Sequence, residues 1–165
     1  MDASPLIYLA KLDALDVFTN SGHLCRITPE VERETARAGL SYEHPDALVV
    51  ADAIRSGLLV RTELTPDEMA VARRLEHEAG GVDRGEAEVL AAATSRAEPA
   101  LLFERRATRL ARSMGIDTWS PVRLLFAGTR SPVELRERVG AFGRLVNMRL
   151  VDVQKLLNLI QDGAQ

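Results

Sequence analysis

Short apolar segments alternate with helices along nearly the whole chain, and this alternation constrains the fold more than any other feature. Strand-like segments lie at 24–27, 58–64, 99–103 and 116–119. Several helices between them begin at a hydroxyl residue followed by proline, as at Thr28-Pro29, because the hydroxyl caps the helix and proline fits its first turn. Strands that alternate with helices favour a mainly parallel sheet with helices on both faces. The sequence therefore predicts an α/β protein.

Length and composition exclude several classes of protein. The chain has 165 residues, of which 46% are hydrophobic and 27% charged, as expected for one globular domain. The single cysteine, Cys25, excludes an intramolecular disulfide and a cysteine-rich zinc site. No segment reaches the roughly 18 uncharged apolar residues of a membrane span, and the first residues do not read as a signal peptide. We therefore expect a cytoplasmic protein.

Acidic residues stand where predicted strands turn into helices. Asp2 precedes the first helix, Glu34 follows the strand at 24–27, Glu86 opens a helix, and Glu104 follows the strand at 99–103. In parallel α/β folds, the carboxyl ends of the strands meet at one edge, where ligands bind. Carboxylates gathered there suit Mg²⁺ or Mn²⁺. The alternative is that these acids only stabilise helix starts through the helix dipole.

The basic residues are almost all arginines, and three of them share a helix face. Of 21 basic residues, only Lys11 and Lys155 are lysines. Spacings of three and four place Arg105, Arg109 and Arg112 on one side of the helix after Glu104. Two interpretations remain open: a track for RNA phosphates, or a solvated face balanced by neighbouring acids. The net charge of −3 provides no global attraction for nucleic acid, so a local patch would be needed.

Four motifs, in order along the chain, together resemble the PIN-domain family. They are DASPLIYLA at 2–10, TPEVERE at 28–34, DRGEAE at 83–88 and LLFERRA at 101–107, followed by a helical tail at 145–160. The first and third motifs resemble the subgroup that reads DASPLI and GEAE. This resemblance implies a three-layer α/β/α sandwich with a mainly parallel sheet. It also implies one domain over 1–165, with a C-terminal helical tail at about 131–161.

The resemblance implies a metal-dependent ribonuclease, similar to the VapC toxins of bacterial toxin–antitoxin pairs. Matched by position, Asp2, Glu34 and Glu86 are the implied ligands of Mg²⁺ or Mn²⁺, and Glu88 is a weaker candidate for the third acid. Glu104 is the implied, imperfect fourth catalytic group. Ser4 matches the small hydroxyl residue that supports the first acid.

The chain departs from the family pattern in two places. An apolar strand normally precedes the first aspartate, whereas this chain reads Met1-Asp2, so we expect the sheet to lack a central strand. The usual pair of aspartates is replaced by Glu104-Arg105, and an arginine there would compete with a cation for the carboxylates. A catalytically degenerate module that binds RNA or protein is therefore the second hypothesis. A structural subunit, whose acids are only helix caps, is the third.

Partners follow from the same reasoning. The ribonuclease hypothesis implies an RNA substrate and a small antitoxin protein. Apolar side chains recur at helical spacing through 145–160 and again at Leu6, Ile7 and Leu9. Packing within the domain explains them, and so does a surface that holds a second copy in a homodimer or an antitoxin helix. The sequence does not separate these explanations.

Overall fold

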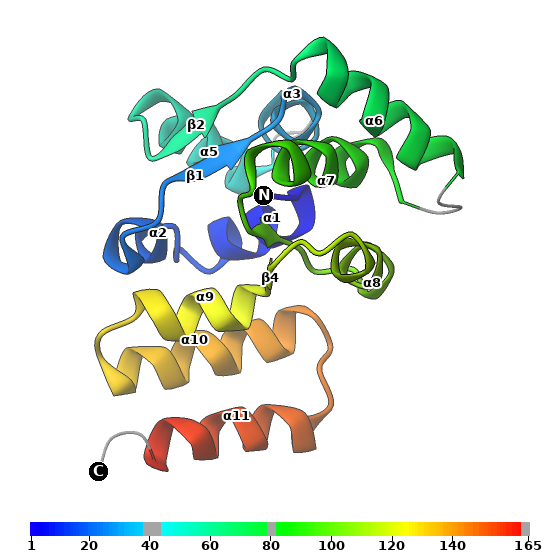
Figure 1. Cartoon of the computed structure of the whole chain (residues 1–165). Helices are drawn as coiled ribbons and strands as arrows, with labels where there is room; N and C mark the ends of the chain where they lie inside the picture. The colour runs from blue at the N-terminus through cyan, green and yellow to red at the C-terminus, as the bar shows by residue number, and fades with distance from the viewer. Residues whose placement is uncertain (38–43, 79–81, 163–165) are drawn as a thin grey trace.

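The computed structural model describes residues 1–37, 44–78 and 82–162, and Figure 1 shows their arrangement. The elements follow the predicted alternation of helices and short strands. In chain order they are α1 (Ala3–Lys11), α2 (Asp16–Ser21), β1 (Cys25–Ile27), α3 (Pro29–Glu32), the π-helix η1 (Arg33–Arg37), α5 (Pro45–Arg55), β2 (Leu59–Arg61), α6 (Pro66–Glu78), α7 (Arg84–Arg96), β3 (Ala100–Leu101), α8 (Arg105–Ser113), β4 (Thr118–Trp119), α9 (Pro121–Gly128), α10 (Pro132–Leu145) and α11 (Leu150–Asp162).

The strands form two small parallel sheets in the described part of the chain, not the single sheet that the sequence predicted. In one, β1 pairs with β2 and Cys25 lies opposite Leu59. In the other, β3 pairs with β4 and Ala100 lies opposite Thr118. The parallel direction is confirmed. The expected continuous sheet is wrong, because the structure has two separate sheets. The N-terminal residues explain this division.

Met1 and Asp2 stand between the two sheets. The Met1 amino group donates to the carbonyl of Arg26 in β1 at 2.9 Å, and the Asp2 N–H donates to the carbonyl of Leu101 in β3 at 3.1 Å. These two residues therefore touch one edge of each sheet, giving the spatial order β2, β1, residues 1–2, β3, β4. Two residues link the edges but do not form a strand ladder between them, so the sheet stays divided.

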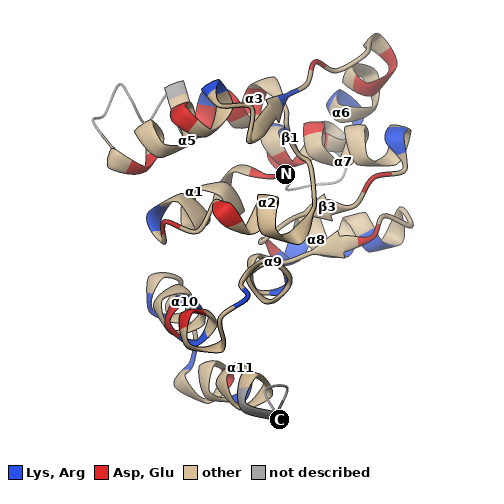
Figure 2. Ribbon diagram, turned by 90° about the vertical axis from the view of Figure 1, so that its left-hand side faces the viewer, with Lys and Arg blue, Asp and Glu red and all other residues tan. Residues whose placement is uncertain are grey.

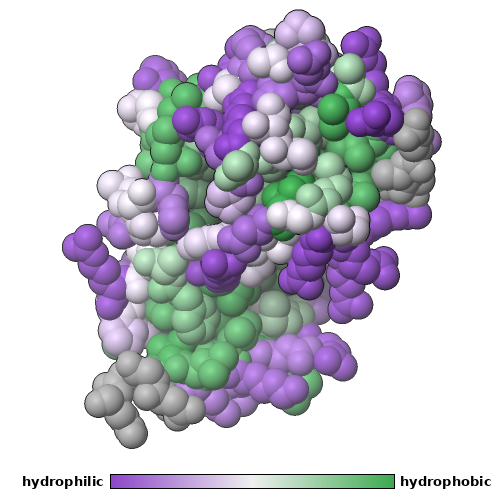
Figure 3. All heavy atoms as spheres, viewed as in Figure 1, coloured by the Kyte–Doolittle hydropathy of each residue, from purple (hydrophilic) through white to green (hydrophobic). Residues whose placement is uncertain are grey.

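A single apolar core joins the helical layers. Helix α6 packs on α7, α2 packs on α9, and α10 packs on α11, so the three C-terminal helices form the lower layer in Figure 1. The largest fully buried side chains come from both halves of the chain, and include Leu6, Ile27, Leu90, Leu125 and Phe142. Figure 3 shows apolar surface over the lower part of the molecule, where the C-terminal helices lie.

Some predicted boundaries are wrong. The helix that begins at Thr28-Pro29 is a short α-helix, α3, followed by the π-helix η1. At the change of helix type, the Thr35 hydroxyl donates to the Val31 carbonyl at 2.7 Å, a side-chain bond of the kind that bends helices. The strand predicted over 58–64 extends only over β2. No helix in the described part of the chain is long and apolar enough to cross a membrane.

Candidate active site

Asp2 is held at the start of α1, in the gap between the two sheets. Its backbone is fixed by the hydrogen bond to Leu101, and its Oδ1 accepts from the Ala3 N–H at 2.8 Å. The residue is only 3% exposed. Burial raises the pKa of Asp2 to about 6, and the charges of Asp83 and Glu104 add to the shift although the Ala3 N–H opposes it. The sequence thus places a carboxylate in a position that disfavours its charge.

Glu86 lies at the start of α7 in a capping box with Asp83. Asp83 Oδ1 accepts from the Glu86 N–H at 2.8 Å, and Glu86 Oε2 accepts from the Asp83 N–H at 3.1 Å. The second oxygen, Oε1, is buried and has no hydrogen-bond partner among the described residues. Burial raises the pKa of Glu86 to about 7, with further contributions from Asp83 and Asp2. A buried carboxylate oxygen without a donor is costly, and a proton or a cation would relieve that cost.

Glu34 lies on η1, and its carboxylate lies beside that of Asp83, next to Gly85. A Cβ atom at Gly85 would lie 3.1 Å from Glu34 Oε2 and 3.4 Å from Asp83 Oδ1, so the glycine leaves room for both carboxylates. Burial and the charges of Asp83 and Glu30 raise the pKa of Glu34 to about 7. Arg33 Nη2, 3.8 Å from Glu34 Oε1, acts against this shift but does not cancel it.

Five carboxylates therefore form one electrostatic group, which we call the acidic cluster: Asp2, Glu34, Asp83, Glu86 and Glu104. The negative charge of Asp83 raises the pKa values of Asp2, Glu34 and Glu86, and the charge of Glu104 raises those of Asp2 and Glu86. Figure 2 shows acidic residues around the N-terminus and the start of α7, with basic residues along α8. Sequence reasoning did not name Asp83 among the candidate metal ligands. The signal that could have identified Asp83 is its position three residues before Glu86, because the two side chains meet in a capping box.

The oxygen donors of the acidic cluster suit a divalent cation, but the described side chains do not form a preformed coordination site. Among the described residues, no three His, Cys, Asp or Glu side chains form a ready metal-binding group. The oxygen donors, the unpartnered Oε1 of Glu86 and the three raised pKa values all favour a hard cation, which would stabilise the ionised carboxylates. Cation binding at this cluster therefore requires side-chain adjustment.

Glu88, the weaker candidate for the third acid, has a different role. Its Oε2 accepts from the Glu30 N–H at 3.1 Å, and its Oε1 lies 3.3 Å from Arg84 Nε. Glu30 in turn pairs with Arg33. These contacts hold the start of α3 against α7, so the Glu88 carboxylate is already engaged. Ser4 lies half-buried in the first turn of α1, two residues after Asp2.

Helix α8 carries exposed positive charge beside the acidic cluster. Glu104 is its N-cap residue and makes no side-chain cap, and Arg105, Arg109 and Arg112 are all exposed. None of the three forms an ion pair with a carboxylate of the described ranges, and Arg112 Nε donates to the Thr118 hydroxyl at 3.4 Å. Arg105 therefore does not neutralise the acidic cluster in this structure, and the guanidinium groups face solvent.

The fold is that of an α/β protein with small parallel sheets between helices. Its acidic cluster lies near the carboxyl ends of β1 and β3. A family model described as a PIN domain, DUF3368, matches residues 1–133, and the chain belongs to this family. PIN domains are commonly nucleases and typically bind metal ions. No match was found among curated proteins or among solved structures. Helix α11 and nearly all of α10 follow the matched segment.

Proposed function

We propose that this chain is a ribonuclease that depends on Mg²⁺ or Mn²⁺ and cleaves phosphodiester bonds. Asp2, Glu34 and Glu86 are the proposed metal ligands, joined by Asp83, and Glu104 is an imperfect fourth catalytic group. The observation that carries the proposal is the buried Oε1 of Glu86, which has no partner among the described residues although other carboxylates surround it. Three carboxylates with raised pKa values at one edge are typical of a functional site rather than of helix caps alone.

The roles of the chain's own residues follow from their positions. When bound, a divalent ion polarises the phosphodiester and lowers the pKa of the attacking water. The exposed guanidinium groups of Arg105, Arg109 and Arg112 bind backbone phosphates beside the acidic cluster, since the arginine fork matches phosphate oxygens. Ser4, in the same turn as Asp2, supports the orientation of that carboxylate. Burial of Asp2 and Glu86 excludes water from their oxygens and strengthens their attraction for a cation.

The test is cleavage of single-stranded RNA by the purified chain in Mn²⁺, with three variants alongside. Asp2→Asn and Glu86→Gln keep size and hydrogen-bond acceptors but remove the charge, and each should lower the cleavage rate about 100-fold. Glu137→Gln is the matched control, because Glu137 is an exposed carboxylate on α10. Cleavage that survives both site substitutions at full rate would rule out this mechanism.

A catalytically degenerate PIN domain that binds RNA is the second candidate, favoured by Arg105 in place of an acid and by the open arrangement of the cluster. This candidate predicts RNA binding that weakens with salt and no turnover in any divalent ion. It also predicts that Glu104→Asp combined with Arg105→Asp would increase Mn²⁺ affinity, measured by calorimetry. A wild-type chain that already cleaves RNA in Mn²⁺ would contradict it.

We extend the first proposal to a biological role as the toxin of a toxin–antitoxin pair. The chain would act as a homodimer, and a small antitoxin protein would neutralise it. Leu150, Val151 and Leu159 are exposed on α11 and offer an apolar surface for such contacts. Induced expression should stop bacterial growth, and Glu86→Gln should restore growth at an equal protein level. Equal toxicity of the variant would contradict the role.

A further inference from the structure

Two arginines meet at one buried carboxylate beside the acidic cluster. Arg33 begins η1 and Arg84 begins α7, so they come from distant parts of the chain. Arg33 Nε donates to Glu30 Oε1 at 3.0 Å, and Arg84 Nε lies 3.7 Å from the other oxygen, Oε2. The hydrogen bonds from Arg33 lower the pKa of Glu30, which keeps this carboxylate ionised. We call Arg33 and Arg84 the arginine pair.

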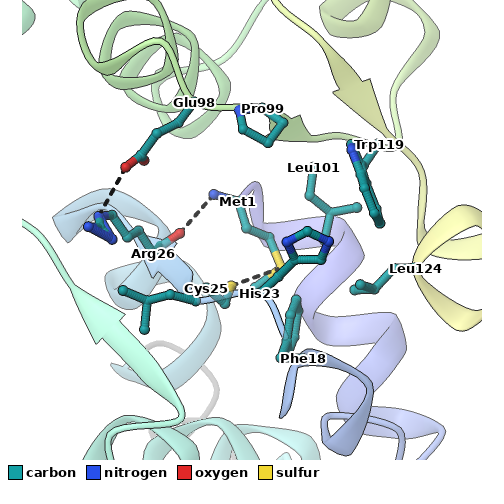
Figure 4. Close-up of a pocket in the computed structure, with 11 residues that line it drawn as sticks. Met1, Phe18, His23, Cys25, Arg26, Glu98, Pro99, Leu101, Trp119 and Leu124 are labelled. Carbon is teal, nitrogen blue, oxygen red and sulfur yellow. Dashed lines mark hydrogen bonds and ion pairs between the residues drawn. The ribbon is translucent and has the colours of Figure 1, made fainter. Parts of the chain in front are cut away.

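Buried acids hold the arginine pair in place. The side chains of Glu30 and Glu88 are 8% and 9% exposed, whereas those of the arginine pair are 56% and 64% exposed. Glu88 Oε1 accepts from Arg84 Nε at 3.3 Å, and Glu88 Oε2 accepts from the Glu30 N–H at 3.1 Å. An ordinary surface ion pair differs, since Arg26 and Glu98 in Figure 4 are both about two-fifths exposed. The inner edge of each guanidinium in the arginine pair is therefore fixed by strong, charge-assisted contacts.

The outer edges of both guanidinium groups keep free hydrogen-bond donors. An arginine carries five N–H donors in a planar fork. Toward the residues that the structure describes, Arg84 donates only through Nε, and Arg33 donates only through Nε and Nη2. The arginine pair and its two glutamates are neutral together, so a ligand would be held by these fixed donors rather than by excess charge. A phosphate suits them, because its oxygens accept several N–H groups at once.

The arginine pair adjoins the acidic cluster on the side away from α8. Arg33 Nη2 lies 3.8 Å from Glu34 Oε1, at the part of the cluster that η1 provides. Helix α3, which leads into η1, and helix α8 lie on opposite sides of the N-terminal residues in both Figure 1 and Figure 2. Exposed guanidinium groups therefore stand on both sides of the acids, on α8 and at the arginine pair.

We propose that the arginine pair binds a backbone phosphate of single-stranded RNA, on the side of the acidic cluster opposite α8. The choice of RNA as the ligand rests on the proposed ribonuclease function. A strand that contacts both the arginine pair and the arginines of α8 crosses the acidic cluster between them. Glu30 and Glu88 are positioning residues, because they fix the two guanidinium groups and do not themselves touch the RNA.

The salt dependence of RNA binding tests the arginine pair without requiring cleavage. The probe is a fluorescein-labelled uridine oligonucleotide of about a dozen nucleotides, and its anisotropy is measured in EDTA from low salt upward. Each phosphate that a protein neutralises on a single strand contributes about 0.7 to the slope of log affinity against log salt. Arg84→Gln keeps a donor for Glu88 but removes the charge and the fork. It should therefore reduce the slope by about 0.7 and weaken binding about tenfold.

Arg149→Gln is the matched control. Arg149 pairs with Asp152 at 2.7 Å and is exposed, so it resembles Arg84 in having a local carboxylate partner and an open outer edge. It lies between α10 and α11, in the lower layer of Figure 1 and away from the acidic cluster. Arg149→Gln should leave both the slope and the affinity unchanged. An equal slope for the wild-type chain and Arg84→Gln would overturn the proposal.

Arg84→Lys separates phosphate binding from a purely structural role. Lysine keeps a positive charge beside Glu30 and Glu88, so the melting temperature should stay close to that of the wild-type chain. It lacks the planar fork, so RNA binding should weaken about threefold while the slope stays the same. This variant also decides the question if Arg84→Gln does not fold. Full RNA affinity in a stably folded Arg84→Lys chain would contradict the role of the guanidinium.

The result is distinguishable from that of the nuclease test. A chain that shows the Arg84→Gln effect but never cleaves RNA in Mn²⁺ retains the phosphate site, and the nuclease proposal fails. A chain that cleaves RNA but binds it equally well with and without Arg84 retains the nuclease proposal, and the phosphate site fails. A wild-type chain that binds no RNA at low salt also overturns the phosphate site.

Discussion

Gly85 decides how closely two acidic side chains approach each other. The carboxylate of Glu34 lies where the Cβ of any other residue would press on it, at 3.1 Å, and the Asp83 carboxylate lies on the same side. Because Gly85 is the second residue of α7 and has no positive φ, its role is space rather than backbone conformation. A residue that looks like a simple helix-start glycine therefore shapes the acidic cluster.

We expect Gly85→Ala to weaken Mn²⁺ binding about tenfold, because the added methyl group displaces Glu34 from Asp83 and neighbours of a metal site tune affinity on that scale. The melting temperature should change little, since the alanine favours the helix while the Glu34 side chain moves aside. Calorimetric titration with Mn²⁺ measures the affinity. Gly140→Ala on α10, where the nearest atom is the end of the Arg144 side chain at 3.6 Å, is the control. Full Mn²⁺ affinity in Gly85→Ala would show that Glu34 is not a ligand.

Local signals at single residues predicted the helix starts well. Thr28, Asp83, Ser120 and Ser131 each accept a backbone N–H at the start of a helix, as their sequence positions indicate. The membership of Asp83 in the acidic cluster was not predictable in this way. It depends on Glu34, which is 49 positions earlier in the chain and reaches Asp83 only through the fold. A helix cap involves only neighbouring residues, whereas the acidic cluster brings together residues that are far apart in the sequence.

At the scale of elements, two helices approach so closely that only a glycine fits between them. A Cβ at Gly128, the last residue of α9, would lie 2.4 Å from the Val17 carbonyl oxygen and 2.6 Å from its Cα in α2. Backbone atoms cannot move aside as a side chain does. The packing of α2 on α9 therefore depends on this position, and it joins the N-terminal helices to the C-terminal layer.

Gly128→Ala should lower the free energy of unfolding by about 1–3 kcal/mol, because overpacking forces α2 and α9 apart. Gly140→Ala, at an open position of α10, should instead raise it by about 0.5–1 kcal/mol. Urea denaturation followed by circular dichroism measures both changes. Similar stability of the two variants would show that the close approach of the helices is not required in solution.

Helix positions were more predictable than strand lengths for a physical reason. A helix completes its hydrogen bonds within one segment, so caps and periodicity identify it, as for α7 and α10. A strand extends only as far as its partner does. The apolar run at 99–103 becomes the two-residue β3 because β4 is equally short and the other edge of β3 meets only the backbone of Asp2.

At the scale of the whole molecule, the motifs predicted the family and the parallel strand direction, and both are confirmed. The Met1-Asp2 start led us to expect a sheet without its central strand, but the motifs did not predict that Met1 and Asp2 would hydrogen-bond to both parts of the divided sheet. Those residues carry structural and chemical roles together, since the backbone of Asp2 joins α1 to β3 and its side chain belongs to the acidic cluster. Stability and metal binding should therefore be coupled in this chain.

This coupling predicts an unusual dependence of stability on pH. Glu34 and Glu86 have pKa values of about 7 and Asp2 about 6 in the folded chain, all above the ordinary carboxyl range near 4. Between pH 4 and 7 the folded chain holds more protons at these groups than the unfolded chain does, so their contribution to stability falls as pH rises. Glu68 acts in the opposite sense, since Arg96 lowers its pKa to about 2, and its stabilising contribution is lost only at acid pH, below this window.

Glu86→Gln isolates the effect of one carboxylate. The glutamine carbonyl still accepts from the Asp83 N–H but carries no charge, so the variant should melt at a higher temperature than the wild-type chain at pH 8 and at a similar temperature at pH 4.5. Excess Mn²⁺ at pH 8 should raise the melting temperature of the wild-type chain, because a ligand that binds the folded state stabilises it, and should raise that of the variant much less. Scanning calorimetry across pH, with and without Mn²⁺, measures both effects. A wild-type chain that is more stable than Glu86→Gln at pH 8 without metal would mean that the Glu86 carboxylate finds a partner in solution, and the acidic cluster would then need no cation.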